Sequence, residues 1–163
     1  MNSAFLSLGS NRGNRQEYLQ NAIAMLEKRA GKVSKRSSIY ETQPWNMSDS
    51  TNFLNQVILI ETALDAPALM EIIIETETSL GRIRTKSGYE PRTIDIDILF
   101  FNDTVINSEL VTVPHPQIPK MRFVLEPLCE LAPEYIHPLL KKSLKQLLSE
   151  CPDTHTIAKL VSK

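Results

Sequence analysis

The order of the apolar patterns along the first 101 residues most strongly limits the folds open to this chain. Runs rich in β-branched and aromatic residues alternate with segments whose apolar residues recur every three to four positions, the spacings of strands and helices respectively. Asp65 with Pro67 marks a helix start, and Gly31 and Gly81 are the expected C-caps. The patterns predict a strand, a helix, two strands, a helix and a strand, at residues 3–9, 15–30, 33–42, 53–62, 65–80 and 92–101.

This order is the split βαβ arrangement of α+β domains, and it predicts a ferredoxin-like βαββαβ core. The remaining sequence adds a C-terminal strand pair and helices, expected at residues 104–107, 110–115, 122–131 and 142–151, with Pro133 ending the first of these helices. Neither an internal repeat nor a linker interrupts the pattern, so we expect a single domain over residues 1–163. Residues 151–163 suggest no function.

Composition excludes several classes of protein. The 18 basic and 19 acidic residues give a formal net charge of -1, which provides no overall attraction to nucleic acid or anionic membranes. No apolar run approaches the roughly 20 residues needed to span a bilayer, and the N-terminus lacks the pattern of a signal peptide. Cys129 and Cys151 form no CxxC pair. We therefore expect a cytoplasmic protein with no membrane or nucleic-acid partner.

Two aspartates interrupt the last strand of the predicted core. Side chains of a strand alternate between faces, so one face should carry Thr93, Asp95, Asp97 and Leu99, and the other Ile94, Ile96, Ile98 and Phe100. The Cα atoms of the two aspartates would lie about 6.5–7 Å apart, close enough for both carboxylates to bind one divalent ion or to bridge two. Mg²⁺ would relieve their mutual repulsion. Alternatively, they are gatekeepers that stop an apolar edge strand from pairing with other chains.

A cationic loop directly before this strand favours the first interpretation. Arg82, Arg84, Lys86 and Arg92 crowd the loop and its exit. Polyphosphates bind both Mg²⁺ and guanidinium groups. The combination indicates a nucleotide site.

Three other segments are candidates for binding. The turn LGSNRGN (8–14) lies between a strand and a helix, where backbone N–H groups can hold an anion, although Asn14 could simply cap the helix. Trp45, Phe53 and Asn55 suit a flat heteroaromatic ligand, although Phe53 could be ordinary core. His115 lies between two prolines and is a candidate hydrogen-bond donor to a phosphate group. The three histidines lack zinc-ligand spacing, and no nucleophile motif of the GxSxG kind is present.

Together these segments, over residues 3–135, resemble the 6-hydroxymethyl-7,8-dihydropterin pyrophosphokinases of folate biosynthesis. The resemblance rests on LGSN (8–11), YETQPW (40–45), FLNQV (53–57), LGRIR (80–84), PRTIDIDIL (91–99), VPHP (113–116) and RFVLEPL (122–128). It implies a ferredoxin-like fold and the transfer of pyrophosphate from ATP to the hydroxymethyl group of the dihydropterin, which yields AMP and the pterin diphosphate. We expect a monomer whose partners are these two substrates.

The resemblance also implies roles for individual residues. Two Mg²⁺ ions would be held by Asp95 and Asp97, and the phosphates by Arg82 and Arg92. Further contacts to ATP would come from Glu77, Arg84, Thr112 and His115. The pterin edge would be read by Gly9, Thr42, Pro44 and Asn55, with the ring between Phe53 and Phe123 and under Trp45 and Tyr89. The loops 43–52 and 82–91 would close to exclude water.

The sequence departs from the family pattern at several phosphate contacts. Met121 stands where many members have Arg, and Lys120 and Arg122 are the candidates to replace that Arg; further departures are Leu110, Thr85 and Ile74. Two other classes stay open on the residues alone. One is a two-metal phosphodiesterase or nuclease, which usually needs more carboxylates, and the other is a ferredoxin-like regulatory module, which leaves the cationic loop unexplained.

Overall fold

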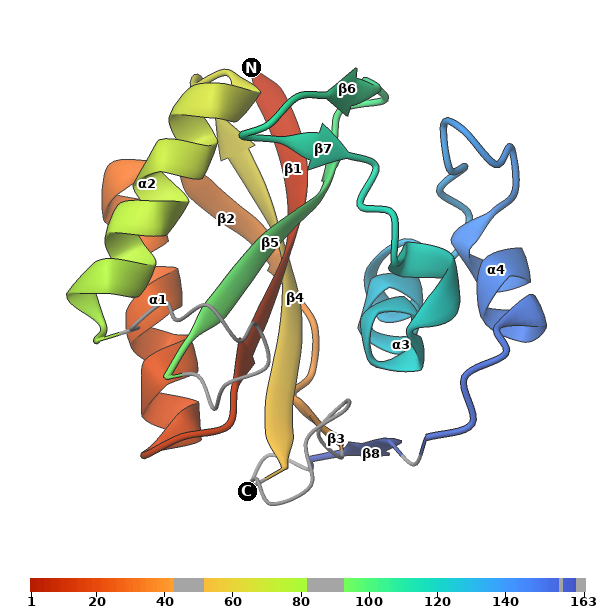
Figure 1. Cartoon of the computed structure of the whole chain (residues 1–163), viewed down its shortest axis with the longest axis horizontal. Coiled ribbons are helices and arrows are strands. Elements are labelled where there is room, and N and C mark those ends of the chain that lie inside the picture. Colours follow the sequence, from red (N-terminus) through yellow and green to blue (C-terminus); the bar gives the residue numbers. More distant parts are fainter. Residues whose placement is uncertain (43–51, 82–92, 156, 161–163) are drawn as a thin grey trace.

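The computed structural model describes residues 1–42, 52–81, 93–155 and 157–160. It contains a central antiparallel sheet with α1 and α2 on one face and α3 and α4 on the other (Figure 1). The core elements are β1 (Asn2–Ser10), α1 (Arg15–Arg29), β2 (Lys32–Arg36), β3 (Tyr40–Thr42), β4 (Phe53–Thr62), α2 (Ala66–Ser79) and β5 (Asp95–Phe101). None of the helices in the described ranges is long and apolar enough to cross a membrane.

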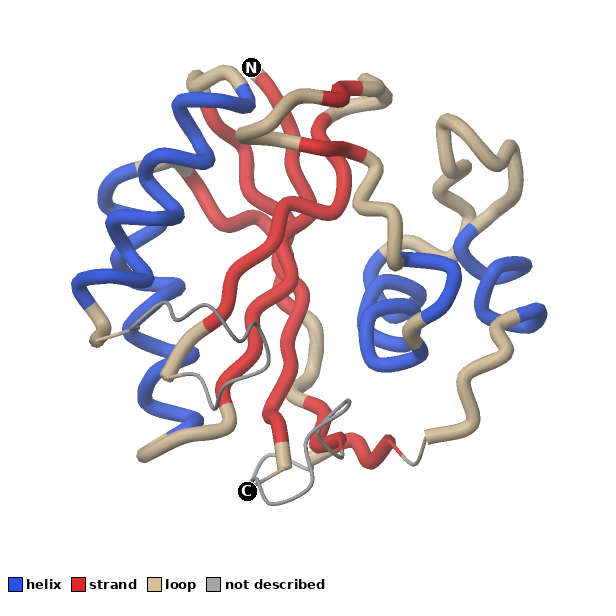
Figure 2. The backbone as a smooth tube through the Cα atoms, viewed as in Figure 1, coloured by secondary structure: helices blue, strands red, loops and turns tan. Residues whose placement is uncertain are grey.

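The sheet has the strand order β5-β1-β4-β3-β8, and β2 also pairs with β4 (Figure 2). Neighbouring strands are antiparallel. The predicted βαββαβ core is therefore confirmed, with β5 at one edge and β1 and β4 at the centre. This order places the ends of β1, β3, β4 and β5 in register: Gly9 lies between Asp95 of β5 and Asn55 of β4, and Asn55 in turn pairs with Tyr40 of β3.

The expected strand at 33–42 is two strands, because residue 37 leaves the ladder. The Ser37 hydroxyl oxygen accepts a hydrogen bond from the N–H of Val57 (2.9 Å), while the Ser37 N–H donates to the Val57 carbonyl (2.8 Å). A side chain thus replaces one backbone acceptor, and the chain bends between β2 and β3. Local competition of this kind by serine is common where regular structure ends.

Both helix starts agree with the sequence, but the role of Gly31 does not. Asn14 caps α1 by accepting from the N–H of Glu17 (3.2 Å), and Asp65 caps α2. The C-cap of α1 is Ala30, and Gly31 is not among the residues with a positive φ. Instead, a Cβ at position 31 would overlap the carbonyl oxygen of Glu61. Gly31 is needed for close approach to β4, whereas Gly81, at φ +89°, does stop α2 in the left-handed region.

A β-bulge in β5 changes one face assignment. The pairing of β5 with β1 runs from Gly9–Asp95 to Leu6–Ile98 and then skips to Phe5–Phe100, so Leu99 is an extra residue. Leu99 and Phe100 both pack in the cluster beneath α3 and α4, while Phe101 joins the cluster beneath α1 and α2. The prediction that Phe100 shares a face with Ile98 is wrong, because the bulge shifts the alternation by one residue.

The C-terminal part follows the predicted order of strands and α-helices, with one additional strand and a short 3-10 helix. The strand pair is β6 (Ile106–Asn107) with β7 (Thr112–Val113), and the helices are α3 (Arg122–Leu131) and α4 (Leu144–Glu150), preceded by a short 3-10 helix, η1 (Ile118–Lys120). The additional strand is β8 (Ile157–Lys159), which pairs with β3 at the edge of the sheet opposite β5. No pattern in the sequence predicts this strand.

Candidate active site

The two aspartates lie at the start of the edge strand β5. Asp95 is opposite Gly9 and Asp97 is opposite Ser7 on β1. Both side chains are half-buried, while Ile96 between them is buried in the core beneath α1 and α2. By alternation the carboxylates project from the opposite face, the face that α3 and α4 cover further along the sheet. The predicted separation into a core face and an acidic face is confirmed up to the bulge.

Glu77 holds the strand between these two aspartates. Its side chain is 2% exposed, and its Oε2 accepts a hydrogen bond from the N–H of Ile96 (2.8 Å). The resemblance implies a nucleotide contact for Glu77; the structure adds a contact to the backbone of β5. The signal was present in the sequence, because Glu77 falls four residues after Ile73 on the buried stripe of α2, where a carboxylate needs a partner.

His115 lies in the loop after β7 and is fixed by two backbone contacts. Its N–H donates to the carbonyl oxygen of Leu99, the bulge residue (2.9 Å), and its Nδ1 accepts from the N–H of Gln117 (3.2 Å). A neutral ring therefore carries its proton on Nε2 and can donate from there. Burial lowers the pKa of His115, and the charge of Asp95 opposes that shift. His115 is thus electrostatically coupled to the acidic face.

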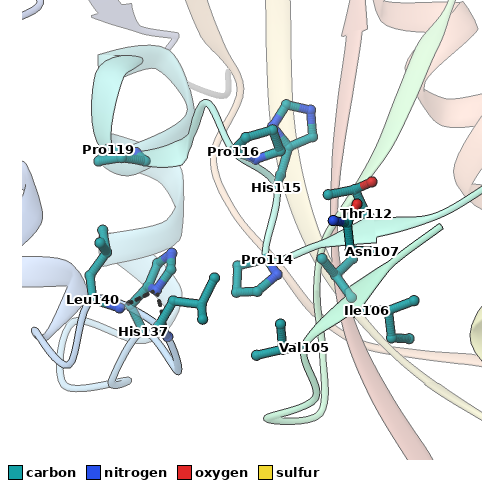
Figure 3. A pocket seen from close by; sticks show the side chains of 12 residues that line it. Val105, Ile106, Asn107, Thr112, Pro114, His115, Pro116, Pro119, His137 and Leu140 are labelled. Carbon is teal, nitrogen blue, oxygen red and sulfur yellow. Dashed lines mark hydrogen bonds between the residues drawn. The ribbon is translucent and has the colours of Figure 1, made fainter. Parts of the chain in front are cut away.

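An apolar hollow of about 320 Å³ lies beside His115 and Thr112. Figure 3 shows the ring of His115 beside Pro116, and Pro114 and Val105 also line the hollow. On the far side His137 accepts through Nδ1 from the N–H groups of Leu139 (3.1 Å) and Leu140 (3.0 Å). The structure therefore places two residues with implied ATP contacts, Thr112 and His115, in the lining of one hollow.

A second group of predicted residues meets where β1, β3 and β4 run side by side. Asn55 is 3% exposed, and its Nδ2 donates to the hydroxyl oxygen of Thr42 (2.9 Å). A Cβ on Gly9 would lie 3.0 Å from Oδ1 of Asn55 and 3.6 Å from the ring of Phe53. Because Gly9 has no side chain, the amide of Asn55 and the ring of Phe53 approach its backbone directly. A buried amide among hydrophobic strand residues provides fixed polar groups that can recognise a ligand edge.

The two rings expected to stack a ligand are both half-buried. Phe53 begins β4 and belongs to neither core cluster of the described residues, which argues against the ordinary-core alternative. Phe123 lies in the first turn of α3 and packs against the cluster beneath that helix. Part of each ring stays accessible. Six other predicted residues lie outside the described residues: Pro44, Trp45, Arg82, Arg84, Tyr89 and Arg92.

The acidic pair fits Mg²⁺ better than a metal held by protein alone. Carboxylate oxygens are hard ligands, and Mg²⁺ binds one or two of them together with water and substrate phosphates. Among the residues that the structure describes, no group of three or more His, Cys, Asp or Glu side chains could hold a metal ion. The described ligand set therefore suits an ion shared with a phosphorylated substrate and does not supply the larger set that two-metal nucleases use.

Comparison with known proteins places the chain among pterin pyrophosphokinases. Residues 5–133 match the family model for 7,8-dihydro-6-hydroxymethylpterin-pyrophosphokinase. The chain is 39% identical over 150 residues to the 2-amino-4-hydroxy-6-hydroxymethyldihydropteridine pyrophosphokinase of Aquifex aeolicus, covering 92% of each chain. It is 44% identical over 131 residues to the Bacillus subtilis protein of that name, covering 80% of this chain and 78% of the relative.

A solved structure supports the fold. The Plasmodium falciparum HPPK-DHPS structure superposes with a TM-score of 0.76 at 19% identity, over 91% of this chain. This chain spans 45% of that longer protein. At such identity the likeness concerns the fold, while the family match and the closer sequence relatives concern the activity. The chain therefore belongs to the 7,8-dihydro-6-hydroxymethylpterin-pyrophosphokinase family.

Proposed function

We propose that residues 1–163 form one catalytic domain in which Asp95 and Asp97 hold Mg²⁺ for the reaction of this family. That reaction transfers pyrophosphate from ATP to the hydroxymethyl group of 6-hydroxymethyl-7,8-dihydropterin. The observation that carries the assignment of the metal ligands is the pair of half-buried carboxylates on β5, two residues apart and next to Gly9 of β1. When bound, Mg²⁺ neutralises charge on the polyphosphate.

The pterin binds where β1, β3 and β4 meet. Asn55 and Thr42 hold each other in one orientation, and this pre-ordered amide reads the hydrogen-bonding edge of the ring. Phe53 and Phe123 contact its faces. Gly9 lies between Asn55 and Asp95 in the strand register, so the same strand that admits the pterin edge also adjoins the acidic pair.

The nucleotide binds along the acidic face of β5. His115 donates from Nε2 to a phosphate oxygen, and Thr112 contacts the nucleotide. Arg82 and Arg92 neutralise charge around the β-phosphorus, with Arg84 as a further cation. The hydroxymethyl oxygen forms a bond to the β-phosphorus, the bond from that phosphorus to the oxygen retained by AMP breaks, and the hydroxyl proton is released. Positioning and charge neutralisation supply most of the catalysis in such a transfer.

The remaining roles concern closure and assembly. Pro44 completes the pterin edge, and Trp45 and Tyr89 cover the ring when their loops close, which excludes water as a competing acceptor. The enzyme acts as a monomer in the cytoplasm. These assignments rest on the family resemblance, and each is open to substitution experiments on the residues named.

The product of the reaction tests the activity. The purified protein, supplied with ATP, Mg²⁺ and 6-hydroxymethyl-7,8-dihydropterin, should form AMP and the pterin diphosphate in equal amounts, measured by chromatography. Formation of ADP, or of inorganic phosphate without a pterin product, would contradict the assignment.

Substitution of the aspartates tests the site. Asp95→Ala and Asp97→Ala should each lower kcat by at least about 1,000-fold, the scale of losing a major electrostatic contact in the transition state, and should abolish the Mg²⁺ dependence of ATP binding measured by calorimetry. Glu109→Ala is the matched control, since it removes an exposed carboxylate elsewhere. If both aspartate variants fold and keep their activity, the gatekeeper alternative is correct.

A further inference from the structure

The C-terminal segment 151–160, which the sequence left without a function, attaches to the core at two places. The first is the edge of the sheet, where β8 pairs with β3 in the register Tyr40–Lys159 and Thr42–Ile157. The N–H of Leu160 also donates to the carbonyl of Ile39 (2.8 Å). The strand that carries Thr42 is therefore held by β4 on one side and by β8 on the other.

The second attachment is the N-terminus of α3. Asp153 is 6% exposed, and its Oδ2 accepts a hydrogen bond from the N–H of Arg122, the first residue of α3 (2.9 Å). Its Oδ1 accepts from the N–H of His155 (2.9 Å) and lies 2.7 Å from the Nδ1 of that ring. A carboxylate at this position satisfies an amide of the first turn and complements the helix dipole. Phe123 is the next residue of the helix.

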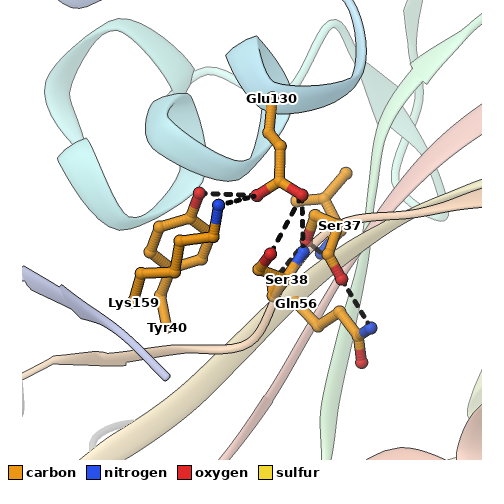
Figure 4. A network of polar contacts seen from close by, with 7 residues as sticks. Ser37, Ser38, Tyr40, Gln56, Glu130 and Lys159 are labelled. Atoms are coloured by element: carbon orange, nitrogen blue, oxygen red, sulfur yellow. Dashed lines mark hydrogen bonds and ion pairs between the residues drawn. The ribbon is translucent and has the colours of Figure 1, made fainter. Parts of the chain in front are cut away.

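A partly exposed polar network joins these two attachments. Glu130 of α3 accepts hydrogen bonds from the N–H (2.9 Å) and hydroxyl (3.1 Å) of Ser38 and from the hydroxyl of Tyr40 (2.6 Å). Figure 4 shows Lys159 of β8 reaching the same carboxylate, 3.9 Å from its Oε1. Helix α3, strand β3 and strand β8 are therefore tied together at one carboxylate.

Both attachments end beside a residue of the pterin site. β8 holds β3 as far as Thr42, the hydroxyl partner of Asn55, and Asp153 holds the turn that carries Phe123. We propose that Asp153 and β8 together form a positioning element that fixes the polar edge and one aromatic wall of the pterin site relative to each other. This inference rests on the proposed function. The segment touches neither β5 nor β7 in any contact described above, so its effect should fall on the pterin and not on ATP.

Two full-length variants test the element at its two ends. Asp153→Ala removes the carboxylate that accepts a hydrogen bond from the N–H of Arg122. Ala158→Pro removes a backbone N–H that points at β3. Ala158 lies two residues before Leu160, whose N–H donates to β3, so both N–H groups lie on the same side of the strand. The side chain of Ala158 is exposed, so the substitution affects mainly the backbone. The matched controls are Asp153→Asn, which keeps an acceptor oxygen, and Ala158→Ser, which keeps the N–H.

The readout is the KM for each substrate and kcat, measured well below the thermal midpoint of each variant. Asp153→Ala and Ala158→Pro should raise the KM for the pterin by about tenfold, as expected when a site loses preorganisation, and leave the KM for ATP within about twofold. Ala158→Ser should match the wild type, and Asp153→Asn should fall between. Equal rises in both KM values, or no rise in folded variants, would overturn the inference.

Phe123→Ala separates this inference from the proposed function. If Phe123→Ala raises the KM for the pterin while Asp153→Ala and Ala158→Pro do not, the pterin site stands and the positioning role fails. If Phe123→Ala leaves that KM unchanged, the proposed pterin site is wrong, and the positioning role is overturned with it. Should Asp153→Ala fail to fold, Ala158→Pro tests the same claim from the other end.

Discussion

Replacing Glu77 by Leu tests whether this buried carboxylate fixes the acidic strand. Leu keeps much of the volume of Glu but has no acceptor, so the N–H of Ile96 loses its 2.8 Å partner. An unpaired buried donor costs about 1–3 kcal/mol, and for a chain of this length each kcal/mol lowers the thermal midpoint by about 2–4 °C. We therefore expect the midpoint of Glu77→Leu to fall by about 2–12 °C.

Activity should fall as well, because Ile96 lies between the two proposed metal ligands. A shift of about 1 Å at a catalytic group can cost about 100-fold in rate, so we expect kcat of Glu77→Leu to drop by about 10–100-fold. Glu77→Gln retains an acceptor oxygen and should lose no more than about 1 kcal/mol, the difference between a charged and a neutral acceptor. Thermal unfolding and steady-state kinetics measure the two effects.

The control is Glu71→Leu, an exposed position on the same helix, which should leave stability and kcat unchanged. If Glu77→Leu unfolds at the wild-type temperature with wild-type kcat, the hydrogen bond to Ile96 neither stabilises nor positions β5. If Glu77→Gln is as damaged as Glu77→Leu, the charge of Glu77 matters more than its acceptor oxygen, and the reasoning from backbone satisfaction fails.

Two further predictions concern the fold. Gly31→Ala should lower the free energy of unfolding, measured in urea, by about 1–3 kcal/mol or more by overpacking, since the added Cβ meets the Glu61 carbonyl. Gly81→Ala has no such clash, because nothing lies within 4 Å, and its loss should be the cost of the positive φ alone, about 1–2 kcal/mol. Burial alone would raise the pKa of Asp153, but hydrogen bonds from the amides of His155 and Arg122 and from the His155 ring outweigh it and hold the pKa below its ordinary value. The stability that Asp153 contributes is therefore complete above the unfolded pKa of about 3.9 and is lost as the pH falls through the lower folded pKa. In urea unfolding, the difference between wild type and Asp153→Asn should shrink as the pH falls through the folded pKa of Asp153; a difference that grows in this acid range would contradict the assignment.

Local patterns predicted the core elements because each amphipathic segment carries its own period. β4 matches the predicted range of 53–62, and Asn14 and Asp65 cap the helices as expected. The predictions fail where a structural feature depends on a contact between residues that are distant in the sequence. Gly31 is explained only by the approach of β4, and the face of Phe100 only by a bulge opposite β1.

The residues of the site likewise fall into two groups, those that a local sequence pattern reveals and those whose contacts depend on the tertiary fold. The acidic pair was visible as two carboxylates in an apolar strand, and Asn55 as a lone amide in another. Glu77 was a candidate through the family resemblance alone, and its contact to β5 depends on how α2 crosses the edge of the sheet. The three residues of β8 carry no strand pattern that separates them from a tail; they form a strand because β3 presents unpaired backbone groups at that edge.

The backbone contacts of β5 help to decide whether Asp95 and Asp97 are gatekeepers of an edge strand or metal ligands. Charged gatekeepers protect an edge whose N–H and C=O groups are open to another chain. Here the N–H of Ile96 is taken by Glu77, and the carbonyl of Leu99 by the N–H of His115. Because Glu77 and His115 already bind backbone groups of this edge, charged side chains are less necessary to prevent it from pairing with another chain. The Leu99 carbonyl, at the bulge, also fixes the backbone of His115, whose pKa is lowered by burial against the opposing charge of Asp95. The covered edge therefore favours the metal-binding role over the protective one.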